Sequence, residues 1–143
     1  MKYEMPDGHG LSKACVEQLV FHEDGNPALT DVQFSALAAG VGKGNSLLVV
    51  SPTSTGKTQI ALWAIANSIE AKTTAVYLVT HRALAKQKFE EFKSVLLKPF
   101  LNGNATSIVL ATGDYVEDAQ GEVPADPLHA SVMVATYEKY LAM

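Results

Sequence analysis

The feature that most constrains the fold of this chain is an octapeptide placed between a short apolar run and a helical pattern. The octapeptide, SPTSTGKT, occupies residues 51–58, and the apolar run SLLVV precedes it at residues 46–50. A continuous apolar run of this length is typical of a strand that is buried on both faces of a parallel sheet. In residues 59–71, which follow, apolar side chains recur at helical spacing. The sequence therefore predicts a strand, a tight loop and a helix in direct succession.

This succession meets the requirements of a loop that binds phosphate groups. Backbone N–H groups must converge on anionic oxygens, a helix must direct its positive end at them, and a lysine must reach the outer phosphates. Gly56 permits close approach of the backbone, Lys57 supplies the charge, and Thr58 can place its hydroxyl on Mg²⁺. The usual pattern has glycine at the first loop position, where this chain has Ser51. The alternative is a serine- and threonine-rich turn that caps a helix, but the flanking strand and helix favour phosphate binding.

The rest of the chain alternates β-rich runs with helical patterns. Three runs are predicted as strands: TAVYLVT at 74–80, SIVLA at 107–111 and SVMVA at 131–135. Residues 81–97 are predicted as a helix, and the acidic, proline-containing stretch between the last two strands as a loop. Shorter helices are expected within residues 11–22 and after Thr30, a suitable N-cap. Strand and helix in alternation favour an α/β fold with right-handed crossovers on a mainly parallel sheet.

Composition and cysteine usage narrow the class of protein. The 143 residues, 48% hydrophobic and 18% charged, suit one globular domain. The single cysteine, Cys15, allows no internal disulfide, and the scattered histidines offer no metal cluster around it, so we expect a reducing, intracellular location (cytoplasm, nucleus or nucleoid). There is no run of about 18 apolar residues and no secretory-signal pattern.

The charge of the chain is unevenly distributed. The net charge of −4 argues against a generally basic coat for nucleic acid. Six of the eleven basic residues nevertheless lie in one stretch: Lys72, Arg82, Lys86, Lys88, Lys93 and Lys98. This stretch fits either the solvated face of a helix or a surface that faces nucleic acid.

Five sequence stretches together resemble a known family. SPTSTGKT resembles motif I of superfamily 2 helicases, and LTDVQ at residues 29–33 resembles their Q-motif, whose glutamine contacts adenine. YLVTHRALA at 77–85 resembles motif Ia, and TGDY at 112–115 resembles motif Ib. VATYEK at 134–139 resembles the strand-to-helix turn that follows. In order and spacing the set is most similar to the DExH-type branch, which includes DNA-repair and RNA-processing helicases.

The resemblance implies a fold, cofactors and binding residues. It implies the three-layer fold of a RecA-like P-loop NTPase, with ATP and Mg²⁺ as cofactors and Thr58 on the metal. The residues that it implies for ATP are Gln33, Thr53, Ser54, Thr55, Gly56, Lys57 and Thr58. Those that it implies for the backbone of DNA or RNA are Arg82, Thr112, Gly113 and Thr136. An arginine at such a turn can pair with a phosphate, and hydroxyls and backbone amides bind phosphates without reading sequence. The alternatives at 112–113 and 136 are an ordinary turn and an ordinary N-cap.

The 143 residues do not contain the acidic box of motif II, an Asp-Glu pair after an apolar strand. The resemblance therefore implies the N-terminal part of RecA-like domain 1, truncated before motif II, in residues 29–143, with residues 1–28 as an extension that holds a short helix. No catalytic residue is assigned, and this polypeptide alone is expected neither to unwind duplexes nor to hydrolyse ATP appreciably. The alternative is a non-catalytic nucleotide- or nucleic-acid-binding module, or one half of a split helicase that another chain completes. A P-loop kinase is disfavoured, because "RALA" and "VATYEK" have no role in one.

Overall fold

The computed structural model describes residues 1–44, 56–113 and 115–143. The chain divides into two compact units, residues 1–67 and 68–143, which are described one at a time. The strand predicted at residues 46–50 lies outside the described residues. Among the helices that the structure describes, none is long and apolar enough to cross a lipid bilayer.

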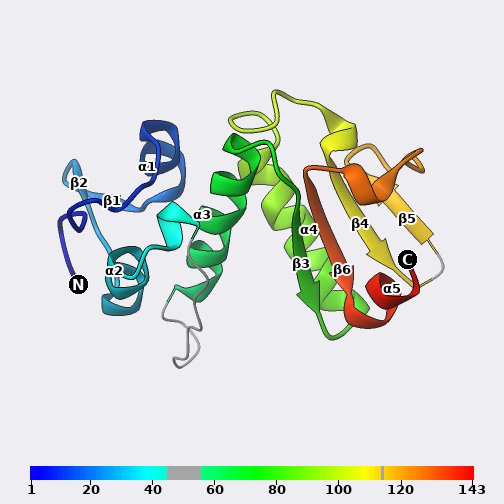
Figure 1. The fold of residues 1–143 in the computed structure, drawn as a ribbon, viewed down its shortest axis with the longest axis horizontal. Helices are drawn as coiled ribbons and strands as arrows, with labels where there is room; N and C mark the ends of the chain where they lie inside the picture. Colours follow the sequence, from blue (N-terminus) through cyan, green and yellow to red (C-terminus); the bar gives the residue numbers. More distant parts are fainter. Residues whose placement is uncertain (45–55, 114) are drawn as a thin grey trace. The chain divides into compact units, whose positions relative to one another are not determined.

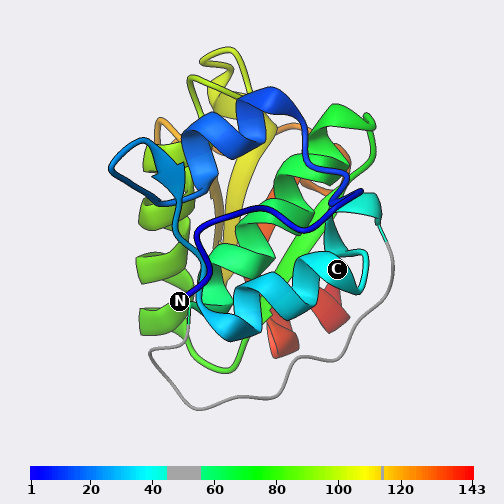
Figure 2. The same ribbon diagram turned by 90° about the vertical axis from the view of Figure 1, so that its left-hand side faces the viewer.

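The first unit is built from short elements and the start of a longer helix, and the path of the chain through them can be followed in Figure 2. Its elements are α1 (Lys13–Leu19), β1 (His22–Glu23), β2 (Asn26–Pro27), α2 (Asp31–Ala38), the 3₁₀ turn η1 (Val41–Lys43) and α3 (Lys57–Glu70), which continues into residues 68–70. β1 and β2 form an antiparallel hairpin. The helices expected within residues 11–22 and after Thr30 are thus present as α1 and α2.

A carbonyl group at the end of α1 fixes this helix to α3. The carbonyl oxygen of Leu19 accepts a hydrogen bond of 2.9 Å from the indole nitrogen of Trp63, and a second one from the side-chain amide of Gln59. Trp63 is fully buried, so its indole N–H needs a protein partner. α1 ends here because Val20 adopts an extended conformation, which leaves the Leu19 carbonyl available to α3.

The second unit is a sheet with a long helix against one face (Figure 1). Its elements are β3 (Ala75–Val79), α4 (Arg82–Leu96), η2 (Ala105–Ser107), β4 (Ile108–Thr112), β5 (Tyr115–Asp118), η3 (Pro127–His129), β6 (Val132–Thr136) and α5 (Tyr137–Ala142). The strand order is β3-β6-β4-β5. β6 runs parallel to both β3 and β4, whereas β5 is antiparallel to β4. The predicted α/β fold with a mainly parallel sheet is confirmed.

The position of each strand explains its burial. β4 and β6 lie inside the sheet, and all of their residues are buried, as their continuous apolar runs predict. α4 packs on β3, β4 and β6 with four buried side chains at helical spacing, Ala85, Phe89, Phe92 and Leu96. The ring of Phe92 meets that of Tyr77 on β3 edge to face, with centroids 4.9 Å apart. This face of the sheet therefore carries the aromatic part of the core.

One strand of this unit was not expected. Residues 115–118 were predicted as part of a loop, but they form β5 at the edge of the sheet. The prediction was wrong because the segment is acidic, whereas its pairing depends on the backbone of β4 and on one buried carboxylate. The Asp118 side chain accepts hydrogen bonds from the backbone N–H groups of Gln120 and Glu122, at 2.9 and 3.1 Å, and so closes the turn after the strand.

Candidate nucleotide and nucleic-acid sites

Gln33 links the start of α2 to the residue before α3. It forms a capping box with Thr30, in which its backbone N–H donates to the threonine hydroxyl at 3.1 Å. Its side-chain oxygen accepts from the backbone N–H of Thr30 at 3.0 Å. Its side-chain nitrogen donates to the carbonyl oxygen of Gly56 at 3.2 Å. Gln33 thus reaches across 23 positions of sequence to the phosphate-loop motif.

Gly56 needs to be glycine for two reasons. Its φ angle of +83° lies in the left-handed region, which L-residues rarely adopt. A Cβ atom at this position would also overlap the side-chain amide of Gln33 and lie 2.9 Å from its Cδ. The space that a side chain at Gly56 would need is thus occupied by Gln33, and the close approach to phosphate that the sequence predicts at this glycine stays a prediction.

Lys57 and Thr58 form the first turn of α3, a helix of 14 residues. The N-terminus of a helix of this length carries a positive dipole end, which suits the phosphates of a nucleotide. A threonine hydroxyl in the first turn suits Mg²⁺. The other predicted loop residues, Thr53, Ser54 and Thr55, lie outside the described residues. The structure therefore brings together Gln33, Gly56, Lys57 and Thr58 of the seven residues predicted for ATP.

A second group of predicted residues meets in the unit of residues 68–143. A pocket of about 580 Å³ lies where β3, β4 and β6 end, and its lining residues are Thr80, His81, Arg82, Gly113, Thr136, Glu138, Lys139 and Ala142. The three strands are parallel, so their carboxyl ends meet at one edge of the sheet. Ligands of open α/β sheets bind at such an edge.

Arg82 and Gly113 are in direct contact in this pocket. Arg82 is the first residue of α4, and Gly113 follows the last residue of β4. A Cβ atom at Gly113 would lie 2.8 Å from Cζ of Arg82, so the guanidinium occupies the space that a side chain would need. Gly113 has a φ of +51°, in the left-handed region.

The two threonines predicted for the nucleic-acid backbone differ in their positions. Thr136 lines the pocket, and its hydroxyl accepts a hydrogen bond of 3.3 Å from the backbone N–H of Lys139, which caps α5. The N-cap alternative is therefore confirmed for Thr136, and its contact with nucleic acid stays a prediction. Thr112 is buried, with 2% of its surface exposed, and is not among the residues that line the pocket.

The motifs did not assign four of the pocket residues that carry polar side chains, Thr80, His81, Glu138 and Lys139. Each lies within three residues of the end of a parallel strand, which is the signal that would have found them. His81 also caps α4, since its Nδ1 accepts from the backbone N–H of Leu84 at 3.3 Å. Lys139 adds a second cation to that of Arg82.

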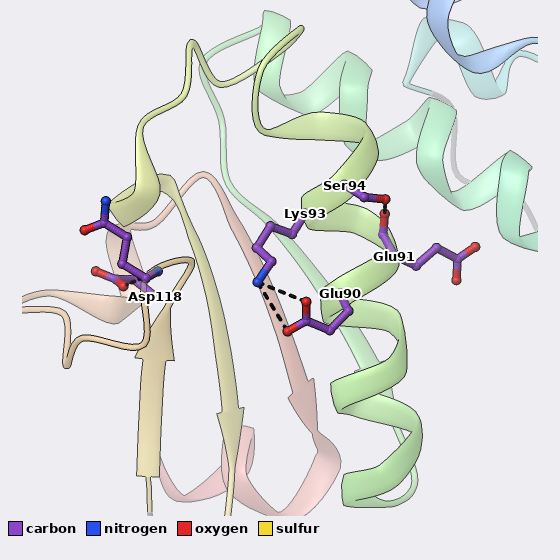
Figure 3. A network of polar contacts seen from close by, with 6 residues as sticks. Glu90, Glu91, Lys93, Ser94 and Asp118 are labelled. Carbon is purple, nitrogen blue, oxygen red and sulfur yellow. Dashed lines mark hydrogen bonds and ion pairs between the residues drawn. The ribbon is translucent and has the colours of Figure 1, made fainter.

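The basic stretch in and around α4 serves more than one role. Lys93 pairs with Glu90 at 3.0 Å, as Figure 3 shows, and Lys88 pairs with Glu91 at 3.2 Å. These pairs lie along the helix at three-residue spacing, and in each of them a glutamate partners the lysine. Arg82, at the N-terminus of the same helix, lines the pocket instead.

A polar pocket of about 420 Å³ lies at the amino ends of β4 and β6, and Asp126 and His129 are among its lining residues. Their side chains form an ion pair with Nδ1 and Oδ2 2.6 Å apart. The hydrogen bond to Asp126 and its negative charge raise the pKa of His129 above the ordinary value of 6.5. The two charges neutralise each other, so this pocket attracts a charged ligand less strongly than the pocket at the carboxyl ends.

The fold is an α/β domain with a mainly parallel sheet and a polar pocket at the carboxyl ends of its parallel strands, as expected of part of a RecA-like domain. Residues 30–143 match the profile of the DEAD/DEAH box helicase family, and the chain belongs to this family. The family predicted from the five motifs is thereby confirmed.

Several curated relatives are similar over most of the chain. It is 38% identical over 113 residues to the ATP-dependent DNA helicase Hel308 of Aeropyrum pernix, which covers 78% of this chain and 14% of the relative. It is also 38% identical over 122 residues to the Hel308 of Pyrococcus abyssi, which covers 85% of this chain and 16% of the relative. The chain thus corresponds to about one seventh to one sixth of the length of these relatives.

Proposed function

We propose that this chain supplies ATP binding and DNA-backbone binding to an ATP-dependent helicase motor inside the cell, with residues 29–143 as part of RecA-like domain 1 and residues 1–28 as an N-terminal extension. Membership of the helicase family supports the motor role. The choice of DNA over RNA is supported by relatives that are named DNA helicases. One structural observation carries the proposal: residues that follow three parallel strands line one polar pocket, which holds two cations, Arg82 and Lys139, and one carboxylate, Glu138.

The nucleotide part of the proposal rests on the N-terminus of α3. Lys57 would reach the outer phosphates of ATP, and the hydroxyl of Thr58 would hold Mg²⁺. Bound Mg²⁺ would neutralise charge on the phosphate oxygens. Gln33 would contact the adenine while it keeps its hydrogen bond to the carbonyl oxygen of Gly56. Thr53, Ser54 and Thr55 would complete the phosphate-binding loop.

The nucleic-acid part rests on the pocket of residues 80–142. Arg82 and Lys139 offer charge to phosphate oxygens, and Arg82 lies at the N-terminus of a helix of 15 residues, whose dipole adds to that charge. Thr136 and the backbone at Gly113 offer hydrogen bonds that do not read bases. Thr112 would act from within the strand, by fixing the turn that carries Gly113.

The test is a titration of the chain with a fluorescent ATP analogue and Mg²⁺. We expect Lys57→Ala to weaken binding by about ten-fold or more, as loss of a charge-assisted contact does. Lys13→Ala is the matched control, because Lys13 is an exposed lysine on α1 with a side chain 91% accessible. Equal affinity of Lys57→Ala and Lys13→Ala would contradict the proposal.

A second test measures ATP hydrolysis by the 143-residue polypeptide. The 143-residue polypeptide tested by itself lacks a motif II box, and we propose that its turnover of ATP stays at the level of Lys57→Ala. Turnover well above that variant would show that carboxylates in this polypeptide already suffice for hydrolysis. ATP binding without DNA binding would instead favour the alternative of a nucleotide-binding module.

A further inference from the structure

We propose that Gly113 is a positioning residue for Arg82. Because it has no side chain, Gly113 lets the Arg82 guanidinium lie flat against the end of β4, in a position to bind a phosphodiester. This inference rests on the proposed DNA-binding function of the same pocket. It adds a role for Gly113 besides the backbone contact that the motif implies. Gly113 would act indirectly: because it has no Cβ atom, it leaves room for the Arg82 guanidinium.

The guanidinium of Arg82 lies close to the backbone of Gly113. From the position of a Cβ atom at Gly113, the distances to Cζ, Nη2 and Nε of Arg82 are 2.8, 2.8 and 3.1 Å. Nearly equal distances to three atoms of one plane mean that the glycine faces the guanidinium plane rather than its edge. Such Cβ distances require something to shift, so any larger residue would displace the guanidinium.

This placement leaves the N–H groups of the Arg82 guanidinium available for a ligand. With its face against the backbone, a guanidinium keeps its N–H groups at the rim, where they can bind phosphate oxygens bidentately. Within the part of the chain that the structure describes, no carboxylate forms an ion pair with Arg82. Lys139 and Glu138 line the same pocket, so a phosphate at this rim would lie near a second cation and one carboxylate.

The position of the Arg82 side chain also affects the free energy of binding. An arginine side chain loses freedom when it binds, and that loss opposes affinity. A guanidinium already held against Gly113 loses less. Glycine at 113 should therefore increase affinity without any contact of a side chain with DNA.

The experiment compares two alanine substitutions that share backbone strain but differ in contact. Gly113 and Gly121 both have positive φ angles, +51° and +82°, but a Cβ atom at Gly121 would meet nothing within 4 Å. Binding is measured by fluorescence anisotropy with a labelled single-stranded oligothymidine. We expect Gly113→Ala to weaken binding on the order of ten-fold, and Gly121→Ala to bind like the unmodified chain.

A double-mutant cycle isolates the link to the arginine. In an Arg82→Ala background, Gly113→Ala should have almost no further effect, because the group that it displaces is gone. If Gly113→Ala binds as tightly as Gly121→Ala, or keeps its full effect without Arg82, the inference is wrong. If Arg82→Ala itself binds as tightly as the unmodified chain, the proposed function of the pocket fails instead.

A measurement on the unmodified chain covers the case in which Gly113→Ala does not fold. The contact predicts nuclear Overhauser effects between the side-chain Nε–H of Arg82 and the Hα protons of Gly113. Their presence supports the inference. Absence of these nuclear Overhauser effects, together with rapid exchange of the Arg82 Nε–H proton with solvent, overturns the inference.

Discussion

The side-chain nitrogen of Gln33 donates a hydrogen bond of 3.2 Å to the carbonyl oxygen of Gly56. The oxygen of the same side chain closes the capping box of α2 through the backbone of Thr30. One buried glutamine therefore connects the N-terminus of α2 to the residue that precedes Lys57.

The first prediction concerns Gly56→Ala. The added methyl group would overlap the amide of Gln33 at a backbone φ of +83°, so we expect affinity for Mg²⁺-ATP to fall about ten-fold or more. Gly25→Ala is the control, because Gly25 has a φ of +78° and nothing within 4 Å of the new atom. A titration with a fluorescent ATP analogue makes the comparison. Equal affinities of the two variants would show that the contact with Gln33 is unimportant.

The second prediction concerns Lys139, the pocket cation that the motifs did not assign. The slope of log affinity against log salt is negative. If Lys139 contacts one phosphate, Lys139→Ala should make this slope less steep by about 0.7 for single-stranded DNA. Lys98→Ala is the control, since Lys98 is an exposed lysine beyond the other end of α4. Anisotropy titrations at several salt concentrations give both slopes. A slope unchanged by Lys139→Ala would remove this residue from the DNA site.

Much of the fold follows from local patterns in the sequence. The runs in β4 and β6 are apolar throughout because both faces of each strand are buried, and this burial is what made them recognisable. β5 could not be recognised in the same way. Its Glu117 and Asp118 oppose a strand prediction, and only the backbone of β4 and the turn after Asp118 explain it.

The candidate sites were predictable to a different degree. The order of motifs placed Arg82, Gly113 and Thr136 after three strands, and parallel strands bring such residues to one edge. The contact between Arg82 and Gly113 was not predictable, because it depends on the left-handed turn after β4 and on the direction of an arginine side chain. The hydrogen bond from Gln33 to Gly56 could not be predicted from the sequence either, since it joins residues 23 positions apart.

The third prediction concerns the stability of the sheet and α4. Phe92 is fully buried, and its ring contacts Tyr77 edge to face. Phe92→Ala should lower the free energy of unfolding by about 3–5 kcal/mol, because it leaves a cavity and removes an aromatic pair. Chemical denaturation followed by circular dichroism gives the value. Tyr137→Ala is the control, because Tyr137 is 50% exposed, and a loss as large as that of Phe92→Ala would contradict the packing described.

The fourth prediction concerns the ion pair between Asp126 and His129. The carboxylate raises the pKa of His129, so the charged imidazole is favoured in the folded chain. The pair should therefore stabilise the fold fully below the ordinary histidine pKa of 6.5, and this contribution should be lost as the pH rises through the raised pKa. Both side chains are well exposed, so the signal to follow is the imidazole titration in an NMR spectrum. Asp126→Asn should lower the pKa of His129, whereas Glu122→Gln should leave it as in the unmodified chain. A titration of His129 that Asp126→Asn does not shift would show that the two side chains are not paired in solution.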